Sequence, residues 1–252
     1  MRLKEKAAIV TGAGSGMGKA IAIRFAEEGA RVVVSDINEG AAEQTASEIR
    51  GSGGEAVSLR TDVTSEQEVE ELIRASVDRF GTLDILVNNA GILDNFVSAK
   101  DLTDELWERV FAVNATGPMR TTRKALPIFL EKGKGNIINI VSLGGLFGSR
   151  AGAAYTAAKH AAVGFTKNVG FQYAGQGIRC NGIAPGSVVT NIGASITAPD
   201  SFGMERAMAG LNLSPRNAQP TEIAGVAVFL ASDDSSFING AIVTADGGWS
   251  AY

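Results

Sequence analysis

The sequence predicts an α/β fold in which a doubly wound parallel sheet of about seven strands carries helices on both faces. Short β-branched runs alternate with segments of helical periodicity, which is typical of strand–helix–strand units. A glycine-rich turn, Gly12–Gly18, joins the first such run to a helix. No linker or change of composition interrupts the 252 residues, so we expect a single domain over residues 1–252.

The predicted strands are short runs that stay apolar along their length, because helices bury both faces of a parallel sheet. Their content of Val and Ile favours strand over helix. In chain order they are Ala7–Val10, Arg31–Ser35, Ala56–Leu59, Ile85–Asn88, Ile137–Val141, Ile178–Ile183 and Ala241–Val243.

The segments between the strands predict helices. In the first of them apolar residues recur at helical spacing from Ala20 to Ala26, and Gly29 stands where a helix C-terminus is expected. The predicted helices are Gly16–Glu28, Glu39–Arg50, Ser65–Phe80, Thr103–Leu130, Ala153–Ala174 and Thr221–Ala231.

Residues 187–218 have no clear period but retain several large apolar side chains, among them Phe202, Met204 and Met208. Long connections without regular structure are uncommon in compact domains and are often functional. Two interpretations stay open. The segment is a substrate-binding loop or lid, or it forms a short helix that packs on the domain.

The composition argues against several classes of function. The net charge is −4 without a cluster of Lys and Arg, which argues against a nucleic-acid partner. Cys180 is the only cysteine, so we expect neither a disulfide nor a metal site built from Cys and His. No run of about 18 apolar residues suggests a membrane partner. We therefore expect a cytoplasmic protein.

The glycine-rich turn indicates a dinucleotide site of the Rossmann type, since glycine lets backbone N–H groups approach a pyrophosphate at a helix N-terminus. The run departs from G-x-G-x-x-G, because Met17 and Lys19 stand where the last glycine would fall. Asp36, at the end of the second strand, is placed to bind the adenosine ribose and to repel a 2′-phosphate, which favours NAD as the cofactor over NADP. Alternatively, Asp36 only caps the helix that begins near Asn38.

Tyr155 and Lys159 are four residues apart in a predicted helix and therefore share one face. A phenol with its usual pKa of about 10 is a poor base near neutral pH. A neighbouring ammonium favours the phenolate, so this pair is a candidate for proton transfer. On its own, however, this spacing is common by chance in helices and more often marks an exposed surface pair.

The motifs of the chain occur in the order of a known family. They are Thr11–Gly18, Asp62–Val63, Asn88–Gly91, Asn114, Ser142, Tyr155-Thr-Ala-Ala-Lys159, and Pro185–Gly186 followed by Thr190. Over essentially its whole length the sequence resembles the short-chain dehydrogenase/reductase family, and within it three-oxoacyl reductases and secondary-alcohol dehydrogenases. It departs from the family at Ala158, where serine is frequent. Ser15 stands where NADP-preferring members often carry a basic residue.

The resemblance implies a role for each of four catalytic residues. Asn114 resembles the helix residue that holds a water in a proton relay, and Ser142 the donor that orients the substrate oxygen. Tyr155 resembles the general acid and base. Lys159 resembles the residue that binds the nicotinamide ribose and lowers the tyrosine pKa. The implied reaction is hydride transfer between NAD(H) and a small or medium-sized ketone or secondary alcohol, in a homotetramer.

The same resemblance assigns the binding residues. Asp62 and Val63 correspond to the adenine site, and Ile183–Gly186 to the segment beside the nicotinamide carboxamide. The cofactor set is Gly12, Ser15, Gly16, Met17, Gly18, Asp36, Asp62, Val63, Asn89, Ala90, Gly91, Tyr155, Lys159, Pro185, Gly186, Val188 and Thr190. The substrate set is Ser142, Gly144, Leu146, Tyr155, Val188 and Ile192, which is mostly apolar and favours an uncharged substrate.

Two other functions stay open, because a fold does not establish an activity. One is a dinucleotide-binding regulator without turnover, against which the intact catalytic residues argue. The other is an epimerase or dehydratase, although such enzymes usually add a larger C-terminal substrate domain. His160 is expected to point away from Tyr155 and to have a structural role, and Cys180 to be a buried, inert thiol.

Overall fold

The computed structural model describes residues 1–251, apart from the side chains of Ala194 and Asn212. Within this range seven parallel strands form one sheet in the order β3-β2-β1-β4-β5-β6-β7. The strands are β1 (Ala7–Thr11), β2 (Arg31–Asp36), β3 (Glu55–Arg60), β4 (Ile85–Asn88), β5 (Gly135–Ile140), β6 (Ile178–Pro185) and β7 (Ile242–Ala245). Every predicted strand is present, and its ends lie within two residues of those predicted.

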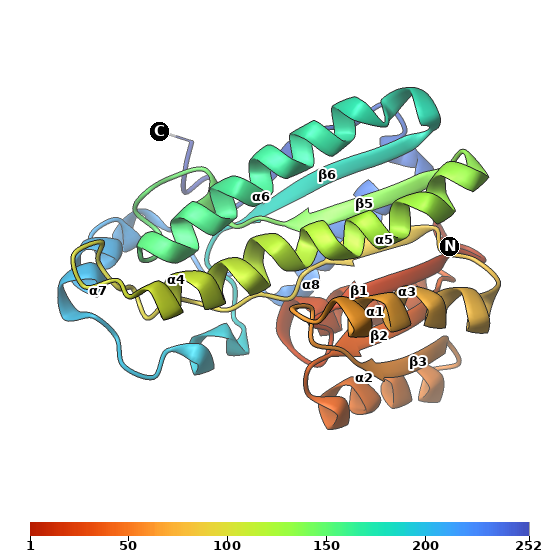
Figure 1. Cartoon of the computed structure of the whole chain (residues 1–252), viewed down its shortest axis with the longest axis horizontal. Coiled ribbons are helices and arrows are strands. Elements are labelled where there is room, and N and C mark those ends of the chain that lie inside the picture. Colours follow the sequence, from red (N-terminus) through yellow and green to blue (C-terminus); the bar gives the residue numbers. More distant parts are fainter. Residues whose placement is uncertain (252) are drawn as a thin grey trace.

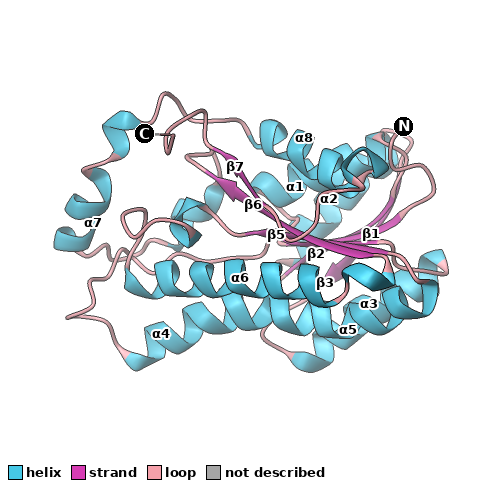
Figure 2. Ribbon diagram, turned by 90° about the horizontal axis from the view of Figure 1, so that it is seen from above, coloured by secondary structure: helices cyan, strands magenta, loops and turns pink. Residues whose placement is uncertain are grey.

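Helices cover both faces of the sheet (Figure 2). One face carries α1 (Gly16–Glu27), α2 (Glu39–Gly51) and α8 (Pro220–Ala231), and the other carries α3 (Glu66–Phe80), α5 (Gly117–Lys132) and α6 (Ala153–Gln172). The remaining helices, α4 (Asp104–Phe111) and α7 (Ser201–Met208), lie at the end toward which β5 and β6 run, on the left of Figure 1. The doubly wound α/β fold is confirmed.

The order in which successive strands are added to the sheet reverses next to β1. Strand β1 pairs with β2 on one side and with β4 on the other, so the connections after β1 and β4 lead to opposite halves of the sheet. In open α/β sheets, ligands bind in the crevice that such a divergence leaves at the carboxyl ends of the strands. The topology therefore places the candidate site beside the ends of β1 and β4.

The predicted helix Thr103–Leu130 is wrong in one respect, because it is not continuously α-helical. A π-helical turn, Ala112–Thr116, separates α4 from α5, and the Gly117 N–H donates to the Ala112 carbonyl five residues back. Pro118, in the first turn of α5, has no N–H with which to make the usual bond to the residue four positions earlier. The extra residue in the turn changes the helical register, and Asn114 within it is fully buried.

Asn88 and Asn139 form a polar link in the interior between β4 and β5. Asn88 Nδ2 donates to Asn139 Oδ1 (2.8 Å), and Asn139 Nδ2 donates to Thr166 Oγ1 of α6 (2.8 Å). Thr121 of α5 donates to Asn88 Oδ1 (2.6 Å). Two central strands and the two helices above them are thereby fixed relative to one another.

Asn139→Ala is expected to lower the free energy of unfolding by about 2–4 kcal/mol, because it removes one hydrogen-bond partner each from the buried Asn88 amide and the buried Thr166 hydroxyl. Urea denaturation measures the change. Gln67→Ala, which removes an exposed amide on α3, should stay within about 0.5 kcal/mol of the wild type. A loss no larger for Asn139→Ala than for this control would contradict the prediction.

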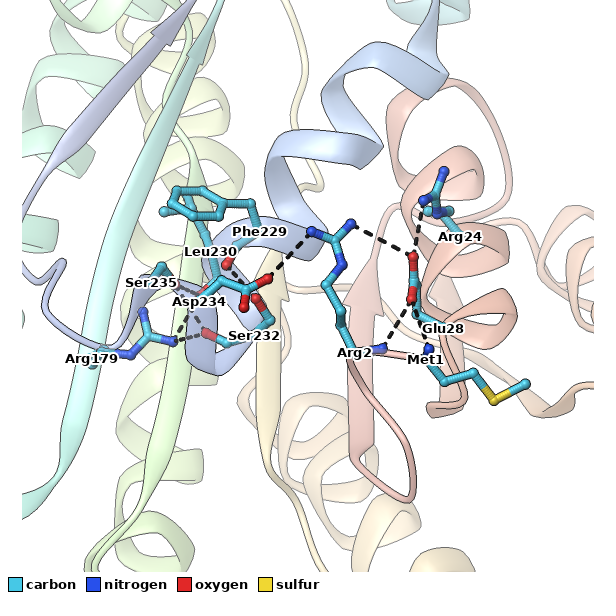
Figure 3. A network of polar contacts seen from close by, with 10 residues as sticks. All are labelled: Met1, Arg2, Arg24, Glu28, Arg179, Phe229, Leu230, Ser232, Asp234 and Ser235. Carbon is cyan, nitrogen blue, oxygen red and sulfur yellow. Dashed lines mark hydrogen bonds and ion pairs between the residues drawn. The ribbon is translucent and has the colours of Figure 1, made fainter.

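At the opposite end of the sheet, near the amino ends of the strands, ion pairs and hydrogen bonds connect the ends of α1 and α8 (Figure 3). Arg2 lies between Glu28 at the end of α1 and Asp234 after α8, with N–O distances of 3.6 Å to each. Hydrogen bonds from the Arg2 N–H and from Arg24 hold the pKa of Glu28 at about 2. Arg179 donates to the carbonyls of Leu230 and Ser232 at the end of α8 (2.9 and 3.1 Å).

The two ends of the segment 187–218 lie side by side where it leaves and rejoins the domain, and we call this pair of chain ends the neck. Val188 and Ala218 form a parallel bridge, and the Ala218 N–H donates to the Ser187 carbonyl (2.9 Å). Helix α7 occupies the middle of the segment, so it is not devoid of regular structure.

Candidate active site

A cavity of about 290 Å³ opens at the carboxyl ends of β1 and β4. Eleven residues of the predicted cofactor set line it, namely Gly12, Ser15, Gly16, Met17, Asp36, Asp62, Val63, Asn89, Ala90, Gly91 and Thr190. Ile192 of the predicted substrate set also lines it. The sequence did not identify the remaining lining residues, Ile37, Thr61, Ile92, Val113, Asn191 and Ser195, because no motif marks them.

The turn between β1 and α1 requires glycine at two positions. Gly12 has a φ of +63°, and a Cβ on it would lie 2.9 Å from Ala90 Cα. A Cβ on Gly18 would lie 2.2 Å from the Gly12 carbonyl oxygen. These absent side chains let α1 begin directly against the end of β1.

Helix α1 presents its N-terminus to the cavity without a side-chain cap. Ser15 is the N-cap residue and makes no capping hydrogen bond, and the first turn holds no acidic residue. Ser15, Gly16 and Met17 all line the cavity. The first N–H groups of α1 and the positive end of its dipole therefore border a space suited to an anion.

Asp36 is a cavity residue and not the cap of α2. Its Oδ2 accepts a hydrogen bond from the Gly14 N–H and its Oδ1 one from the Asn38 N–H, both at 2.9 Å. The cap of α2 is Asn38, whose side chain accepts from the Ala41 N–H. The alternative in which Asp36 only caps that helix is therefore wrong.

Three other residues that line the cavity, Asp62, Val63 and Asn89, are held in place by neighbouring protein groups. Asp62 Oδ1 accepts from the Thr64 N–H (2.8 Å) and hydroxyl (2.7 Å). A Cβ on Gly117 would lie 3.0 Å from Val63 Cγ2, so Val63 packs closely against the start of α5. Asn89 Nδ2 donates to the carbonyls of Thr11 (2.9 Å) and Gly12 (3.0 Å), which ties the ends of β1 and β4 together.

Tyr155 and Lys159 lie one turn apart in α6, and both are buried, with exposed fractions of 6% and 4%. Lys159 Nζ lies 5.6 Å from the centroid of the Tyr155 ring and donates to the Ile140 carbonyl (2.8 Å). A Cβ on Gly91 would lie 3.6 Å from Nζ, so the ammonium lies against a residue that lines the cavity. The alternative of an exposed surface pair is wrong.

Ser142 follows β5 in a conformation that residues other than glycine rarely adopt. Its φ is +67° and its ψ 155°, which for a non-glycine residue costs of order 1–3 kcal/mol. Its Oγ accepts from the Gly144 N–H (3.1 Å), so the hydroxyl hydrogen is free to donate elsewhere. A Cβ on Gly144 would lie 3.1 Å from Tyr155 Cε1 and 3.6 Å from Ser142 Oγ, so these two side chains converge at Gly144.

Burial shifts the pKa values of both Tyr155 and Lys159. Burial raises the pKa of Tyr155, a hydrogen bond with Ser142 opposes the shift, and the Asp94 carboxylate adds to it. Burial also lowers the pKa of Lys159 to about 8. Burial thus sets the direction of both shifts, and the expectation that Lys159 favours the phenolate stays a prediction.

Asn114 uses its side chain to hold the backbone of Ile92. Nδ2 donates to the Ile92 carbonyl (2.9 Å), and Oδ1 accepts from the Ile92 N–H (3.1 Å). The side chain is thus occupied by protein. The carbonyl of Asn114 lies four residues before Pro118, which has no N–H to donate to it.

Several predicted residues are not among those that line the cavity. From the cofactor set these are Gly18, Tyr155, Lys159, Pro185, Gly186 and Val188, and from the substrate set Ser142, Gly144 and Leu146. Gly18 packs beneath Gly12, and Val188 packs on the core as part of the neck. Leu146 packs on an apolar cluster that contains Trp249.

The remaining candidates take no part in the site. His160 is exposed, and its Nδ1 lies 2.9 Å from the Thr156 carbonyl on the surface of α6. Cys180 is fully buried, and burial raises its pKa to about 12, which agrees with an inert thiol. Across residues 1–251, no three His, Cys, Asp or Glu side chains are grouped to hold a metal ion. None of the helices in this described range has the length and apolar character needed to cross a bilayer.

Comparison with known proteins identifies the class of this chain. Residues 12–250 match the family model described as enoyl-(acyl carrier protein) reductase. The chain is 46% identical over 251 residues to 3beta-hydroxysteroid dehydrogenase 2 of Eggerthella lenta, with 99% of this chain and 96% of that protein covered. It is 37% identical over 250 residues to cyclohexanol dehydrogenase of Acinetobacter sp. (strain SE19), with 99% and 97% covered.

A solved structure agrees with the sequence matches. It is a 7 alpha-hydroxysteroid dehydrogenase complexed with NADH and 7-oxo glycochenodeoxycholic acid, and it is 38% identical with a TM-score of 0.88. The match covers 98% of this chain and 95% of that one. This similarity over the full length, together with the parallel sheet and the cavity at β1 and β4, is that of an oxidoreductase of alcohols and ketones with a nicotinamide cofactor. The chain belongs to the short-chain dehydrogenase/reductase family.

Proposed function

We propose that this protein transfers hydride reversibly between NAD(H) and a secondary alcohol or ketone on an alicyclic ring, with Tyr155 as the general acid and base. The observation that carries the proposal is the convergence of the Tyr155 ring and the Ser142 hydroxyl at Gly144. The Lys159 ammonium lies near the Tyr155 ring and against Gly91, which lines the cavity.

The residues around the cavity fit a dinucleotide. The uncapped N-terminus of α1 offers N–H groups to a pyrophosphate, and Gly12 leaves room for it to approach the backbone. Each oxygen of Asp36 accepts one backbone hydrogen bond and keeps a lone pair for a ribose hydroxyl. Ser15 and Ile37 offer no positive charge to a 2′-phosphate, which supports NAD as the preferred cofactor.

The chemistry of the chain is proton transfer and orientation. The nicotinamide ring, when bound, takes up or returns the hydride. Ser142 donates its free hydroxyl hydrogen to the substrate oxygen and so aligns that oxygen with Tyr155. In reduction the Tyr155 hydroxyl gives its proton to this oxygen, and in oxidation the phenolate accepts the proton of the alcohol. A positioned acid or base of this kind contributes about 10²–10⁴-fold to the rate.

Lys159 and Asn114 complete a path for the proton. Lys159 Nζ lies beside the Tyr155 ring and binds the Ile140 carbonyl at 2.8 Å. The Asn114 carbonyl, which Pro118 cannot engage, is an acceptor for a water that exchanges protons with Lys159. The support for this role is that Pro118 deprives the Asn114 carbonyl of the α-helical donor four residues on.

The substrate assignment is supported by the apolar lining and by the relatives. Ile92, Ile192 and Ser195 line the cavity, and among the residues that the structure describes no Lys or Arg does. The relatives named above act on a hydroxysteroid and on cyclohexanol, which both carry the hydroxyl on an alicyclic ring. Residues 187–218 act as a lid whose exposed Met204 and Met208 would cover such a ring. The homotetramer and the cytoplasmic location stay predictions.

A substrate panel tests the proposal. Cyclohexanol, a 3beta-hydroxysteroid and glycerol 3-phosphate are each supplied with NAD⁺, and NADH absorbance is followed. We expect turnover of at least one ring alcohol and none of the phosphorylated alcohol. An enzyme that binds NADH but turns over neither ring alcohol, nor the matching ketones in reverse, would overturn the proposal.

The oxidation rate is expected to rise with pH. Oxidation needs the phenolate of Tyr155, and burial raises the pKa of this group, so at neutral pH the phenol is protonated. The kcat/KM for oxidation should therefore rise by up to about tenfold per pH unit above pH 7. The rise should slacken above pH about 8, where Lys159 loses the charge that favours the phenolate. Ketone reduction should stay level over the neutral range, and an oxidation profile equally level from pH 7 to 9 would contradict the assignment.

A further inference from the structure

Asp94 is a fully buried carboxylate in the loop after β4, and no role described above uses it. Its Oδ1 accepts hydrogen bonds from the N–H groups of Phe96 (3.2 Å) and Gly152 (3.1 Å). Its Oδ2 accepts from the Tyr155 N–H (2.8 Å). A carboxylate is costly to bury unless hydrogen bonds satisfy it, and here backbone donors do so.

The carboxylate acts as the cap that α6 lacks in its own sequence. Gly152 is the N-cap residue of α6 and has no side chain to accept from the first N–H groups. Asp94 supplies these acceptors from 58 residues before Gly152 and 61 before Tyr155. A Cβ on Gly152 would lie 2.5 and 2.6 Å from the Asp94 oxygens, so glycine is needed there for the carboxylate to enter.

The loop that carries Asp94 also holds the part of the lid that leads into α7. Asn95 and Phe96 have φ values of +56° and +58°, a strained conformation for residues other than glycine. In this conformation the Asn95 carbonyl accepts from the Asp200 N–H (2.9 Å), and Asn95 Oδ1 accepts from the Thr197 N–H (3.0 Å). Asp200 in turn caps α7. One short loop therefore contacts the first turn of α6 and the chain that leads into α7.

We propose that Asp94 is a positioning residue, whose carboxylate sets the place of Tyr155 and ties the first turn of α6 to the loop that holds residues 197–200. The inference rests on the proposed function, in which Tyr155 exchanges the proton. A shift of the carboxylate moves the Tyr155 backbone nitrogen directly, and it moves Asn95, the residue next to it, at the same time. The placement of the tyrosine and the seating of the lid are thereby coupled.

The charge of Asp94 provides a second signature. Burial is the main cause of the raised pKa of Tyr155, and the Asp94 carboxylate raises it further by disfavouring the phenolate. The titratable groups near Tyr155 are Asp94 from this loop and Lys159 from the next turn of α6. Removing the Asp94 charge while Lys159 is kept should therefore make the phenolate easier to form.

Two variants separate the positioning of Tyr155 by the Asp94 hydrogen bonds from the effect of the Asp94 charge on the Tyr155 pKa. Asp94→Ala removes every acceptor, and since a displacement of about 1 Å can cost about 10²-fold in rate, we expect kcat to fall by about that factor while the Kd for NADH stays near the wild-type value. Asp94→Asn keeps the shape and one acceptor oxygen but loses the charge. We expect it to lose less kcat than Asp94→Ala and to shift the alkaline rise of the oxidation profile to lower pH. Rates are expressed per NADH-binding site, measured by fluorescence titration.

Thr103→Ala is the matched control. Thr103 caps α4 by accepting from the Leu106 N–H (3.3 Å), so its loss destabilises a helix start without removing a hydrogen bond to the Tyr155 backbone. We expect a lower Tm with wild-type kcat and pH profile. Should both Asp94 variants behave as this control does, Asp94 is only a structural cap and the inference is overturned. If Asp94→Ala does not fold, kcat and the pH profile of Asp94→Asn decide.

Tyr155→Phe in the same assays separates a failure of the proposed function from a failure of the role of Asp94. Wild-type turnover in Tyr155→Phe removes the proposed function and, with it, the positioning role. An inactive Tyr155→Phe beside fully active Asp94 variants keeps the function and overturns only the role of Asp94.

Discussion

Tyr155→Phe is expected to bind NADH as the wild type does and to lose about 10²–10⁴-fold in turnover in both directions. The phenylalanine ring keeps the packing of the buried tyrosine against Ala154, Ala158 and Val110, so α6 and the cavity should be unchanged. The variant lacks only the hydroxyl that exchanges a proton with the substrate oxygen. Steady-state ketone reduction and alcohol oxidation, combined with NADH fluorescence titration, measure the two properties separately.

Tyr173→Phe makes the same chemical change elsewhere in the chain. Tyr173 follows α6 and packs on the apolar cluster that contains Leu72, Phe129 and Cys180, and it is not among the residues that line the cavity. Its hydroxyl has no part in the proposed chemistry, so this variant should retain the wild-type rate. Near wild-type turnover in Tyr155→Phe would refute the assignment of the acid and base.

The positions of the strands could be predicted closely, because the strands of a parallel sheet covered on both faces are continuous apolar segments of the sequence. Residues such as Val32–Val34 and Ile137–Ile138 are buried on each side and therefore appear as unbroken apolar runs. The turn Gly12–Gly18 could also be predicted from its glycines, since the close approach of the backbone at Gly12 and Gly18 leaves no room for a side chain. Most of the cofactor cavity follows from these two features.

Features set by tertiary contacts could not be predicted in this way. The π-helical turn at Asn114 leaves the spacing of apolar residues nearly intact, so Thr103–Leu130 has the pattern of one helix. Its cause lies in Pro118 and in the packing of Gly117 against Val63, a residue from another part of the chain. The raised pKa of Tyr155 likewise depends on how deeply the phenol is buried, whereas the spacing in the sequence pointed only to Lys159.

Asp94 had a weak signal that was missed. It is an acidic residue between Ile92, Leu93, Phe96 and Val97, a setting in which a charge must find partners. The partners are backbone N–H groups of α6, which no residue type in the sequence reveals. In this chain the buried acid of an apolar stretch caps the N-terminus of α6, whose N-cap residue lies 58 residues further along.

The double variant Asp36→Asn with Ile37→Arg is expected to raise the ratio of kcat/KM for NADP⁺ over NAD⁺ by about 10⁴–10⁵-fold. The repulsion between two unit charges at 4 Å is about 4 kcal/mol at an effective dielectric constant of 20, and removing Asp36 relieves it for a 2′-phosphate. An arginine at the exposed position 37 adds a hydrogen bond to a charged group, which contributes about 1.5–3 kcal/mol. Asparagine is chosen because its oxygen can still accept from the partly buried Gly14 N–H, while the exposed Asn38 N–H can bind water.

Glu39→Gln is the control for the change of charge. Glu39 is exposed in the first turn of α2, three residues after Asp36, so the variant removes one negative charge from the same region without altering the group that faces the cavity. Because exposed charges are strongly screened, its coenzyme preference should remain that of the wild type. A preference for NADP⁺ in the wild type, or an unchanged ratio in the double variant, would mean that the Asp36 carboxylate does not contact the ribose. The discrimination would then have to arise from other residues along the cavity, such as Ser15 or Thr61.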